Sequence, residues 1–439
     1  SGKTKAVISK DGSHYKITGQ KMWISNAGFA KLFIVFARIE DDKNITGFIV
    51  PHEPNNGITL GQEEKKLGIH SSSTRQVFFN ETKVPVENML SKRGSGFKIA
   101  MNSLNVGRIK LAVACLDAQK RVTTNAIQYA NERIQFKTKI IDFEAIKEKI
   151  ANMTTDTYVG ESACYRAAKN IEDRIKIRHE NGNSFQESEL KGVEEYVIEC
   201  SILKVAVSED MQNIADDGIQ VFGGMGFSAD TPMEGAWRDC RIGRIYEGTN
   251  EINRMLSVGM LIKKAMKGHI DFINPATAVS DELMGIPSFD IPDLTELFAQ
   301  EKLILKNLKK VFLMLAGAGI KKFGDKLEEH QLMLMGVSDI LIEIYMSESA
   351  LLRTEKNCNR FGKENQSEQI AMTQLYLYKA VDIIQTKGKE VIISFSSGDE
   401  QKGLLMGLKR FTKYYEFPNI IGLKNQIAEK LKEENQYCF

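Results

Sequence analysis

The spacing of apolar residues changes near residue 95 and divides the chain into parts of different secondary structure. In residues 1–95, segments such as AVISK-DG-SHYKITG alternate apolar and polar residues around Asp11 and Gly12. Alternation with a period of two, interrupted by an Asp-Gly pair, is typical of β-hairpins. We therefore expect a partial β-sandwich or small barrel in this region.

From residue 96 to about 268, apolar residues recur every three or four positions, as they do on one face of a helix. Two clear runs fall in residues 111–129 and in residues 193–214, and the second helix is expected to start near Val193. A polar stretch at 178–189, RHENGNSFQESE, is expected to form a loop. Long antiparallel helices with few breaks predict an up-and-down four-helix bundle.

Residues 269–293 lose this periodicity and carry three prolines, so we interpret them as a linker or a loosely docked segment. Helical spacing returns afterwards in residues 297–317, 332–352 and 370–386, which predicts three helices of a second C-terminal bundle. The chain of 439 residues is too long for one ordinary core. The predicted fold is mainly α with a β part, in domains 1–95, 96–268 and 269–439.

Composition and charge exclude several classes of protein. Hydrophobic residues make up 42% of the chain and charged residues 26%, with a mean hydropathy of −0.26. These values exclude a disordered chain and a membrane-embedded bundle. The net charge of +2 provides no general attraction for nucleic acid, which we do not expect as a partner.

Cysteine and histidine spacing indicates neither a disulfide framework nor a metal site. The six cysteines form no CxxC pair and several lie in helical patterns, as reduced, buried thiols of an intracellular protein do. The six histidines are scattered and form no HExxH motif, so no metal is expected. The chain begins SGKTKAVISK, so we expect a fragment whose targeting signal, if any, lies upstream.

Two stretches stand out in the first 110 residues. GQKMWISNAG contains Trp23, which is either a residue of the β core or an aromatic wall against a flat cofactor, with the hydroxyl of Ser25 nearby. LNVGRIK places Gly107 early in a helix, at a cost of about 1 kcal/mol relative to Ala, so we expect it to make space for another group. Arg108 is either a surface charge or an anion contact.

Two further stretches lie in the predicted bundle. QVFGGMGF has three glycines in a turn, where backbone N–H groups can cradle a pyrophosphate. No strand precedes it, so it is not a Rossmann fingerprint. RIGRIYEGTNEINR places Glu247 among apolar residues and beside Gly248. Glu247 is either a solvated carboxylate at a helix start, favoured by the helix dipole, or a base directed at a substrate.

These four stretches, in this order and spacing, resemble the acyl-CoA dehydrogenase family. The matching segments are KMWISNAG, KLGIHSSST, RIQF, QVFGGMGF and IYEGTNEI. The resemblance covers residues 1 to about 260, and the helical region up to Phe439 resembles that of the very-long-chain branch. Family members have an N-terminal helical domain, a middle β domain and a four-helix bundle, with FAD between the last two. The resemblance implies that the N-terminal domain and part of the β domain are missing here.

The resemblance implies roles for residues around Glu247. Glu247 matches the family's catalytic base, which takes the α-proton of an acyl thioester while the β-hydride moves to flavin N5. An apolar pocket raises the pKa of a carboxyl and makes it a stronger base. Gly248 leaves room for the thioester, and Asn105 and Arg108 match positions near the CoA and active-site end. Some members carry the base at the position of Gly107, and in the long-chain branch a small residue there widens the acyl cavity.

The resemblance also implies an FAD site and a homodimer. Trp23 would flank the isoalloxazine, Ser25 would lie near N5, and Thr249 would contact the flavin. Lys137 stands where the family usually has Gly, and Glu144 stands where many members have a cofactor-contacting Gln. The residues expected to bind the adenosine diphosphate part of FAD from the neighbouring subunit are Arg133, Gln135, Phe136, Gln220 and Gly224.

The implied activity is FAD-dependent α,β-dehydrogenation of long-chain acyl-CoA to trans-2-enoyl-CoA in fatty-acid β-oxidation, with electron-transferring flavoprotein as the electron acceptor. An acyl-CoA oxidase and a non-catalytic paralogue, such as a respiratory-complex assembly factor, stay open as alternatives. The near-neutral charge disfavours the DNA-associated branch of the family.

The expected location is the cytoplasm of a bacterium, or the mitochondrial matrix or inner-membrane face of a eukaryote. Residues 269–293 correspond roughly to a region that is linked with membrane association in the very-long-chain branch. They lack a basic amphipathic stripe, so peripheral membrane contact stays an open alternative.

Overall fold

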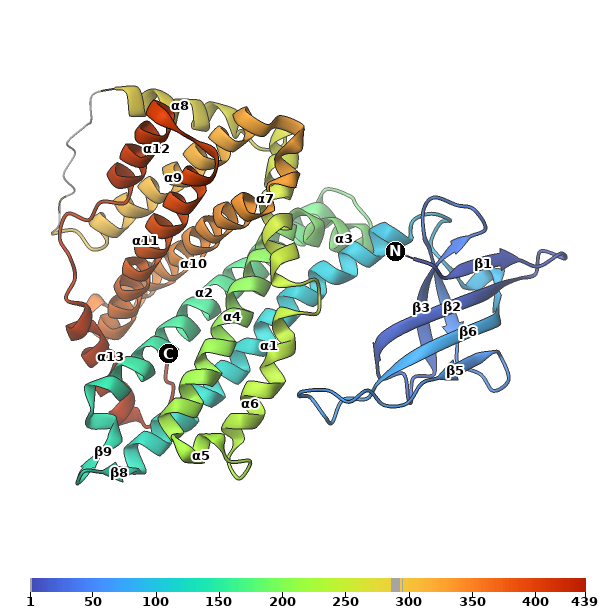
Figure 1. The fold of residues 1–439 in the computed structure, drawn as a ribbon, viewed down its shortest axis with the longest axis horizontal. Coiled ribbons are helices and arrows are strands. Elements are labelled where there is room, and N and C mark those ends of the chain that lie inside the picture. Colours follow the sequence, from blue (N-terminus) through green and yellow to red (C-terminus); the bar gives the residue numbers. More distant parts are fainter. Residues whose placement is uncertain (1, 286–292, 294) are drawn as a thin grey trace. The chain divides into compact units, whose positions relative to one another are not determined.

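The computed structural model describes residues 2–285, 293 and 295–439 (Figure 1). The last part of the predicted linker, residues 286–292, lies outside the described residues. Contacts divide the chain into two compact units, Ser1–Val106 and Gly107–Phe439. The first unit holds the β region, and the second holds both predicted helical regions. The division into three domains stays a prediction.

Seven strands form one mixed sheet in the first unit. Its order is β5-β6-β2-β1-β3-β4-β7, and all neighbours are antiparallel except β1 and β3. The hairpin predicted at Asp11 and Gly12 joins β1 to β2, with Gly12 at φ 72°. The strands are β1 (Lys5–Ile8), β2 (His14–Ser25), β3 (Leu32–Ile39), β4 (Thr46–Pro51), β5 (Ile58–Leu60), β6 (Thr74–Pro85) and β7 (Met89–Leu90).

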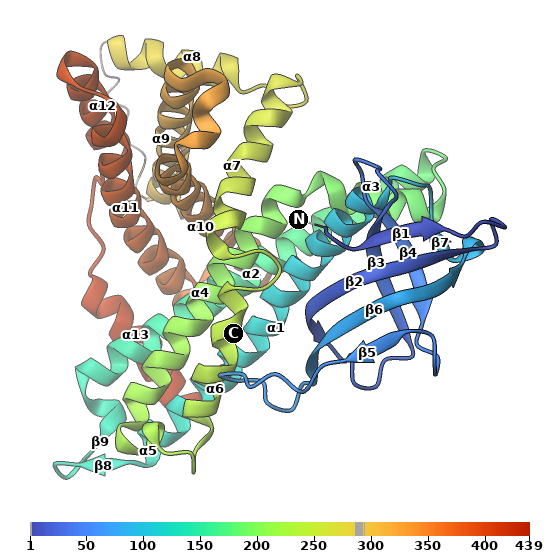
Figure 2. The same cartoon turned by 45° about the vertical axis from the view of Figure 1, so that its right-hand side comes forward.

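The sheet bends so that its two halves pack against each other. In Figure 2, β2, β6 and β5 lie in front of β3 and β4. The ring of Tyr15 on β2 meets that of Phe48 on β4 with centroids 5.2 Å apart, and Phe33 on β3 meets Phe79 on β6 at 6.4 Å. Edge-to-face pairs of this kind stabilise a core beyond their burial alone. The β part that the alternating pattern predicts is therefore present, as one bent sheet.

Four long helices form the first bundle: α1 (Gly96–Glu132), which begins in the first unit, α2 (Glu144–Glu180), α4 (Val197–Phe222) and α7 (Asn250–Met266). By length and composition alone, α1 could cross a membrane, but its residues Leu111, Leu116 and Val122 pack in the bundle core. The connections contain the β8–β9 hairpin (Ile134–Gln135, Thr138–Lys139), α3 (Phe185–Glu195), α5 (Gly224–Phe227), α6 (Pro232–Cys240) and 3-10 helices at Ile140–Asp142 and Arg241–Arg244.

The helix expected to start near Val193 is two helices, and this prediction was wrong. α3 begins inside the predicted loop and ends at Glu195, and Tyr196 separates it from α4. Ser184 caps α3, because its hydroxyl accepts a hydrogen bond from the N–H of Glu187 at 3.2 Å. A Ser followed three residues later by Glu is the capping-box signature of a helix start.

The predicted linker at 269–293 contains a helix, α8 (Ile273–Met284), so the interpretation of its described part as a linker was wrong. Pro275 lies in the first turn of α8, where its missing N–H removes no helical hydrogen bond. Phe272 and Val279 pack in the core of the C-terminal region. Burial of these side chains, rather than local periodicity, accounts for the helix.

The three predicted C-terminal helices are confirmed as α9 (Ala299–Phe323), α10 (Gln331–Phe361) and α11 (Ser367–Phe395). Residues of α10 and α13 also share the core of the first bundle, among them Met346 on α10 and Leu431 on α13. The two helical regions therefore form one unit. The remaining helices are α12 (Gly398–Phe411), α13 (Ile420–Glu434) and 3-10 helices at Val86–Asn88, Gly324–Glu329 and Lys363–Gln366.

The β8–β9 turn predicts a stabilising substitution. Phe136 and Lys137 have φ values of 50° and 65°, a left-handed conformation that favours glycine. We expect Lys137→Gly to raise the free energy of unfolding by about 0.5–1 kcal/mol, measured by urea denaturation. Lys139→Gly is the matched control, because Lys139 has an extended backbone at φ −61° and should lose stability on the same change. Equal losses in both variants would contradict a strained turn.

Candidate active site

Glu247 lies in a left-handed turn between the 3-10 helix at Arg241–Arg244 and α7. Glu247 and Gly248 have φ values of 60° and 83°. Thr249 ends the turn as the N-cap of α7, where its hydroxyl accepts a hydrogen bond from the N–H of Ile252 at 3.4 Å. A non-glycine residue with positive φ persists only when surrounding contacts hold it there.

Three buried side chains hold the carbonyl groups of this turn. Arg108 on α1 donates from Nε to the carbonyl oxygen of Glu247 at 3.1 Å. Lys204 on α4 donates from Nζ to the carbonyl oxygen of Gly248 at 2.7 Å. Asn253 donates from Nδ2 to the carbonyl oxygens of Gly248 and Thr249, at 2.8 and 3.1 Å. The donors come from three helices, so the packing of the bundle fixes the turn.

The carboxylate of Glu247 occupies the space beside Gly107 on α1. A Cβ atom added to Gly107 would lie 2.6 Å from Oε2 of Glu247 and 2.8 Å from its Cδ. Those separations are shorter than van der Waals contact, so any side chain at 107 would displace the carboxylate. The space that the sequence predicts at Gly107 is therefore where the Glu247 carboxylate lies.

The electrostatic surroundings of Glu247 combine burial with two cations. Burial raises the pKa of the half-buried Glu247 carboxyl above its usual value, while the charges of Arg108 and Lys204 lower it. Burial, together with the charge of nearby Arg108, lowers the pKa of Lys204 to about 8. Arg108 is also buried and its pKa falls for that reason. The site thus holds a carboxyl that is more basic than usual near two partly desolvated cations.

Four of the five residues predicted around the substrate come together here: Gly107, Arg108, Glu247 and Gly248. The fifth, Asn105, lies two residues before Gly107 on α1 and is buried. Arg108 is not a surface charge, because only 3% of it is exposed. It binds a backbone carbonyl of the turn.

Trp23 and Ser25 lie at the end of β2 in the first unit. The register of β2 against β6 shifts between Lys21 and Ile24, and Trp23 takes φ 59° at this irregularity. Trp23 is 62% exposed, so the reading of Trp23 as a β-core residue is wrong. An exposed indole and an exposed hydroxyl on one strand end leave an aromatic face available to a ligand.

The residues predicted to bind adenosine diphosphate are exposed at one end of the helical unit. Figures 1 and 2 place the β8–β9 hairpin beside α5. The rings of Tyr129 and Phe222 stack with centroids 4.1 Å apart, joining the ends of α1 and α4 beneath these segments. A Cβ atom at Gly224 would meet nothing within 4 Å. The exposed residues are Arg133, Gln135, Phe136, Gln220 and Gly224.

Sequence reasoning missed Lys204 and Asn253. Lys204 stands in the apolar run SILKVAV of α4 and is fully buried. A lysine at a core-facing helical position must be hydrogen-bonded, since a buried unpaired charge is costly. That interruption of the apolar face was the available signal. Asn253 carried none, because a polar residue in the first turn of a helix is ordinary.

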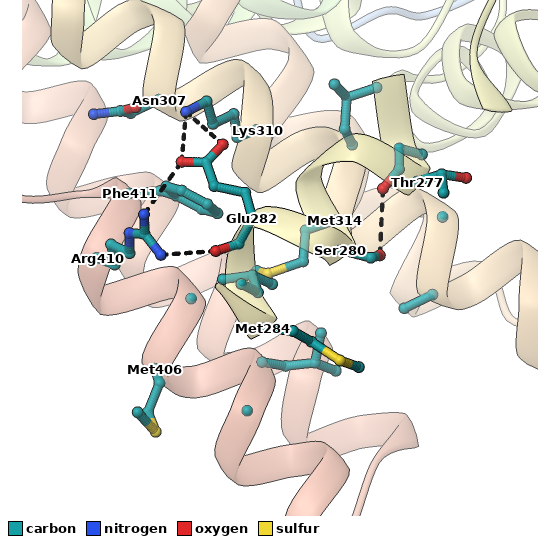
Figure 3. A pocket seen from close by; sticks show the side chains of 18 of the residues that line it. Thr277, Ser280, Glu282, Met284, Asn307, Lys310, Met314, Met406, Arg410 and Phe411 are labelled. Carbon is teal, nitrogen blue, oxygen red and sulfur yellow. Dashed lines mark hydrogen bonds and ion pairs between the residues drawn. The ribbon is translucent and has the colours of Figure 1, made fainter. Parts of the chain in front are cut away.

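A separate cavity of about 1510 Å³ lies in the C-terminal helical region, between α8, α9 and α12 (Figure 3). The carboxylate of Glu282 forms ion pairs with Lys310 at 2.8 Å and with Arg410 at 3.4 Å. None of the residues predicted from the sequence to form the site lines this cavity. It is therefore distinct from the turn at Glu247.

Family models match most of the chain. A model described as acyl-CoA dehydrogenase, middle domain, matches residues 1–82. Two models described as acyl-CoA dehydrogenase, C-terminal domain, match residues 94–260 and 307–410. The second of these covers most of α9 and all of α10 and α11, so the C-terminal helical region also has counterparts in this family.

Individual relatives agree with the family models. A probable acyl-CoA dehydrogenase of Bacillus subtilis is 39% identical over 99% of this chain and 72% of its own length. The mitochondrial very long-chain specific acyl-CoA dehydrogenase of Rattus norvegicus is 30% identical over 94% of this chain and 63% of its own length. The crystal structure of an acyl-CoA dehydrogenase complexed with FAD from Bacillus anthracis superposes with a TM-score of 0.93 at 38% identity, over 100% of this chain and 74% of that one. The chain belongs to the acyl-CoA dehydrogenase family.

Proposed function

We propose that this chain forms the β and helical parts of an FAD-dependent enzyme that oxidises long-chain acyl-CoA to trans-2-enoyl-CoA, with Glu247 as the base. The observation that carries the proposal is the carboxylate of Glu247, held by a strained turn in the space beside Gly107. A solvated carboxylate at a helix start would need neither the three buried donors nor the missing side chain.

The surroundings of Glu247 suit removal of a weakly acidic proton from carbon. Burial raises the pKa of its carboxyl, and a carboxylate of higher pKa is a stronger base. Arg108 and Lys204 oppose this rise, which favours the ionised form that can accept the α-proton. Gly248 has no side chain to block the approach of a thioester. The backbone N–H of Glu247 would hold the thioester carbonyl, as the resemblance implies.

Two sets of residues match the positions that bind the flavin nucleotide in the family. Trp23, Ser25 and Thr249 would contact the isoalloxazine, and the relative from Bacillus anthracis supports FAD as the nucleotide. When bound, FAD would accept the hydride from the β-carbon of the substrate. The exposed end formed by the β8–β9 hairpin and α5 would bind the adenosine diphosphate part of FAD from the other subunit of a homodimer, through Arg133, Gln135, Phe136, Gln220 and Gly224.

The preference for long acyl chains rests on two supports. The very long-chain specific relative aligns with most of this chain, including the C-terminal helices. The second support is the resemblance, because the long-chain branch also has a small residue at the position of Gly107, although in this structure the Glu247 carboxylate occupies the space beside it. Electron-transferring flavoprotein would accept the electrons. The location in the cell and contact with a membrane surface stay predictions.

The first test is anaerobic flavin reduction by palmitoyl-CoA in wild type and in Glu247→Gln. The protein is loaded with FAD and carries the family's N-terminal region ahead of residue 1. We expect the absorbance of the flavin to bleach in wild type and to bleach about 10²–10⁴-fold more slowly in the variant, which lacks the base.

Glu189→Gln is the matched control, because Glu189 is an exposed residue of α3 and its loss should leave the rate unchanged. Absence of bleaching with every acyl-CoA, despite bound FAD, would favour the non-catalytic paralogue. Rapid reoxidation of the reduced flavin by air would favour the oxidase.

Gly107→Ala tests the fit between α1 and the carboxylate. The new Cβ should push the Glu247 carboxylate away and slow flavin reduction roughly tenfold to a hundredfold, since a displacement of about 1 Å can have this effect. Gly259→Ala on α7 is the control, because a Cβ there meets nothing within 4 Å. It should raise stability by about 1 kcal/mol without changing the rate. A rate for Gly107→Ala equal to wild type would contradict the fit.

Glu247→Gln should also stabilise the protein at neutral pH. The pKa of Glu247 is higher in the folded state than in the unfolded state. The protein therefore loses stability as the pH rises from the unfolded pKa through the folded pKa, and the loss persists at higher pH. Glutamine has no charge to bury, so urea denaturation at pH 8 should give a higher midpoint for the variant. The difference should shrink as the pH falls below 4.5, the ordinary pKa of a Glu carboxyl, because Glu247 then becomes protonated in both states. A variant less stable than wild type at pH 8 would show that burial does not disfavour the carboxylate.

A further inference from the structure

A continuous set of hydrogen bonds starts at the carbonyl of Gly248. Lys204 is fully buried. Its Nζ donates to that carbonyl and also to Oδ1 of Asn250, the latter at 2.6 Å. Asn250 in turn donates from Nδ2 to Oε1 of Glu209 at 2.9 Å. Lys204 and Glu209 both come from α4, and Asn250 is the first residue of α7. The start of α7 is therefore bonded to α4 on both sides of its Asn250 carboxamide.

Arg254 extends this set of bonds to the C-terminal helices. It lies one turn after Asn250 on α7, and its Nη1 and Nη2 atoms donate to both carboxylate oxygens of Glu209, at 2.6 and 2.7 Å. Its Nε donates to Oδ1 of Asp339 on α10 at 2.6 Å. The Arg254 side chain is only 15% exposed. Two-point binding of a guanidinium by a carboxylate fixes its orientation as well as its position.

A second bond joins α7 and α10 beside Asp339. The hydroxyls of Ser257 and Ser338 lie 2.9 Å apart, and both residues are buried. The contact between the two helices is thus polar, directional and shielded from water at this point. Bonds of this kind set the position of α7 along its axis more narrowly than apolar packing does.

We propose that Asp339, through Arg254, Glu209, Asn250 and Lys204, is a positioning residue for Glu247, so that the C-terminal helical region holds the base in its left-handed turn. This inference rests on the function proposed for Glu247. Residue 247 is not glycine, so its positive φ needs contacts that keep it from relaxing. Arg108, Lys204 and Asn253 supply these contacts directly, and Asp339 fixes the helix that carries Asn250 and Asn253.

Asp339→Asn removes the negative charge of this one side chain on α10 and keeps its size. Arg254 would keep its pair with Glu209, so no buried cation loses every partner. The matched control is Glu348→Gln, which removes a carboxylate of similar exposure from the same helix. Glu348 pairs with Arg166 on α2 at 2.9 Å and has no bond to the turn.

The experiment uses the FAD-loaded protein with the N-terminal region described above. Two properties are measured: the limiting rate and half-saturation of flavin reduction by palmitoyl-CoA, and amide hydrogen exchange in residues 245–250. For Asp339→Asn we expect a rate roughly tenfold lower, a half-saturation within about twofold of wild type, and faster exchange in the turn but not across α10. Asp339→Glu restores the carboxylate and should recover the rate to within about threefold.

The inference is overturned if Asp339→Asn and Glu348→Gln give the same rate and the same exchange in the turn, whether both are unchanged or both are lowered. Should Asp339→Asn fail to fold, Arg254→Lys is measured in its place. It keeps the charge but reduces the number of donors, and the same changes are expected. If Glu247→Gln reduces flavin as fast as wild type, the proposed function fails. The exchange of residues 245–250 then still decides whether Asp339 positions the turn.

Discussion

The candidate site depends on two buried cations that bind backbone carbonyls. Arg108 and Lys204 come from different helices and bond consecutive carbonyls, those of Glu247 and Gly248. Burial of a charged group is unfavourable unless hydrogen bonds compensate for the lost water. Here each cation binds the backbone of a turn that would otherwise relax. The two unfavourable features, buried charge and positive φ, therefore stabilise each other.

Ion pairs with two buried carboxylates join the two helical regions. Lys379 on α11 binds both carboxylate oxygens of the buried Asp156 on α2 at 3.1 Å, and the charge of Asp156 raises the pKa of Lys379. Arg353 on α10 binds Glu161 on α2 at 2.9 Å. These pairs lie beside apolar contacts that α10 and α13 make with the first bundle. The C-terminal helices thus belong to the core that positions α1, α4 and α7, and their contribution to the site follows from that packing.

Much of the fold could be predicted from the sequence, and its errors have physical causes. Apolar spacing predicted the β region, the long helices and α9, α10 and α11, because burial of one face repeats along each element. It missed α8 because Pro275 was taken as a break, although proline suits a first helical turn. It missed the boundary between α3 and α4 because Tyr196 interrupts the helix without a glycine or proline.

The sequence by itself determined that a β region precedes the long helices, which family the chain belongs to, and that Glu247 is the candidate base, since these reside in local patterns and motifs. Only the tertiary structure decided what surrounds that carboxylate. Arg108 and Glu247 are 139 residues apart in the sequence. Gly107 contacts Glu247 only because α1 packs beside the turn that precedes α7. The parts played by Lys204, Arg254 and Asp339 depend on how three helices are aligned. No local pattern encodes that alignment, because it results from the packing of the whole core.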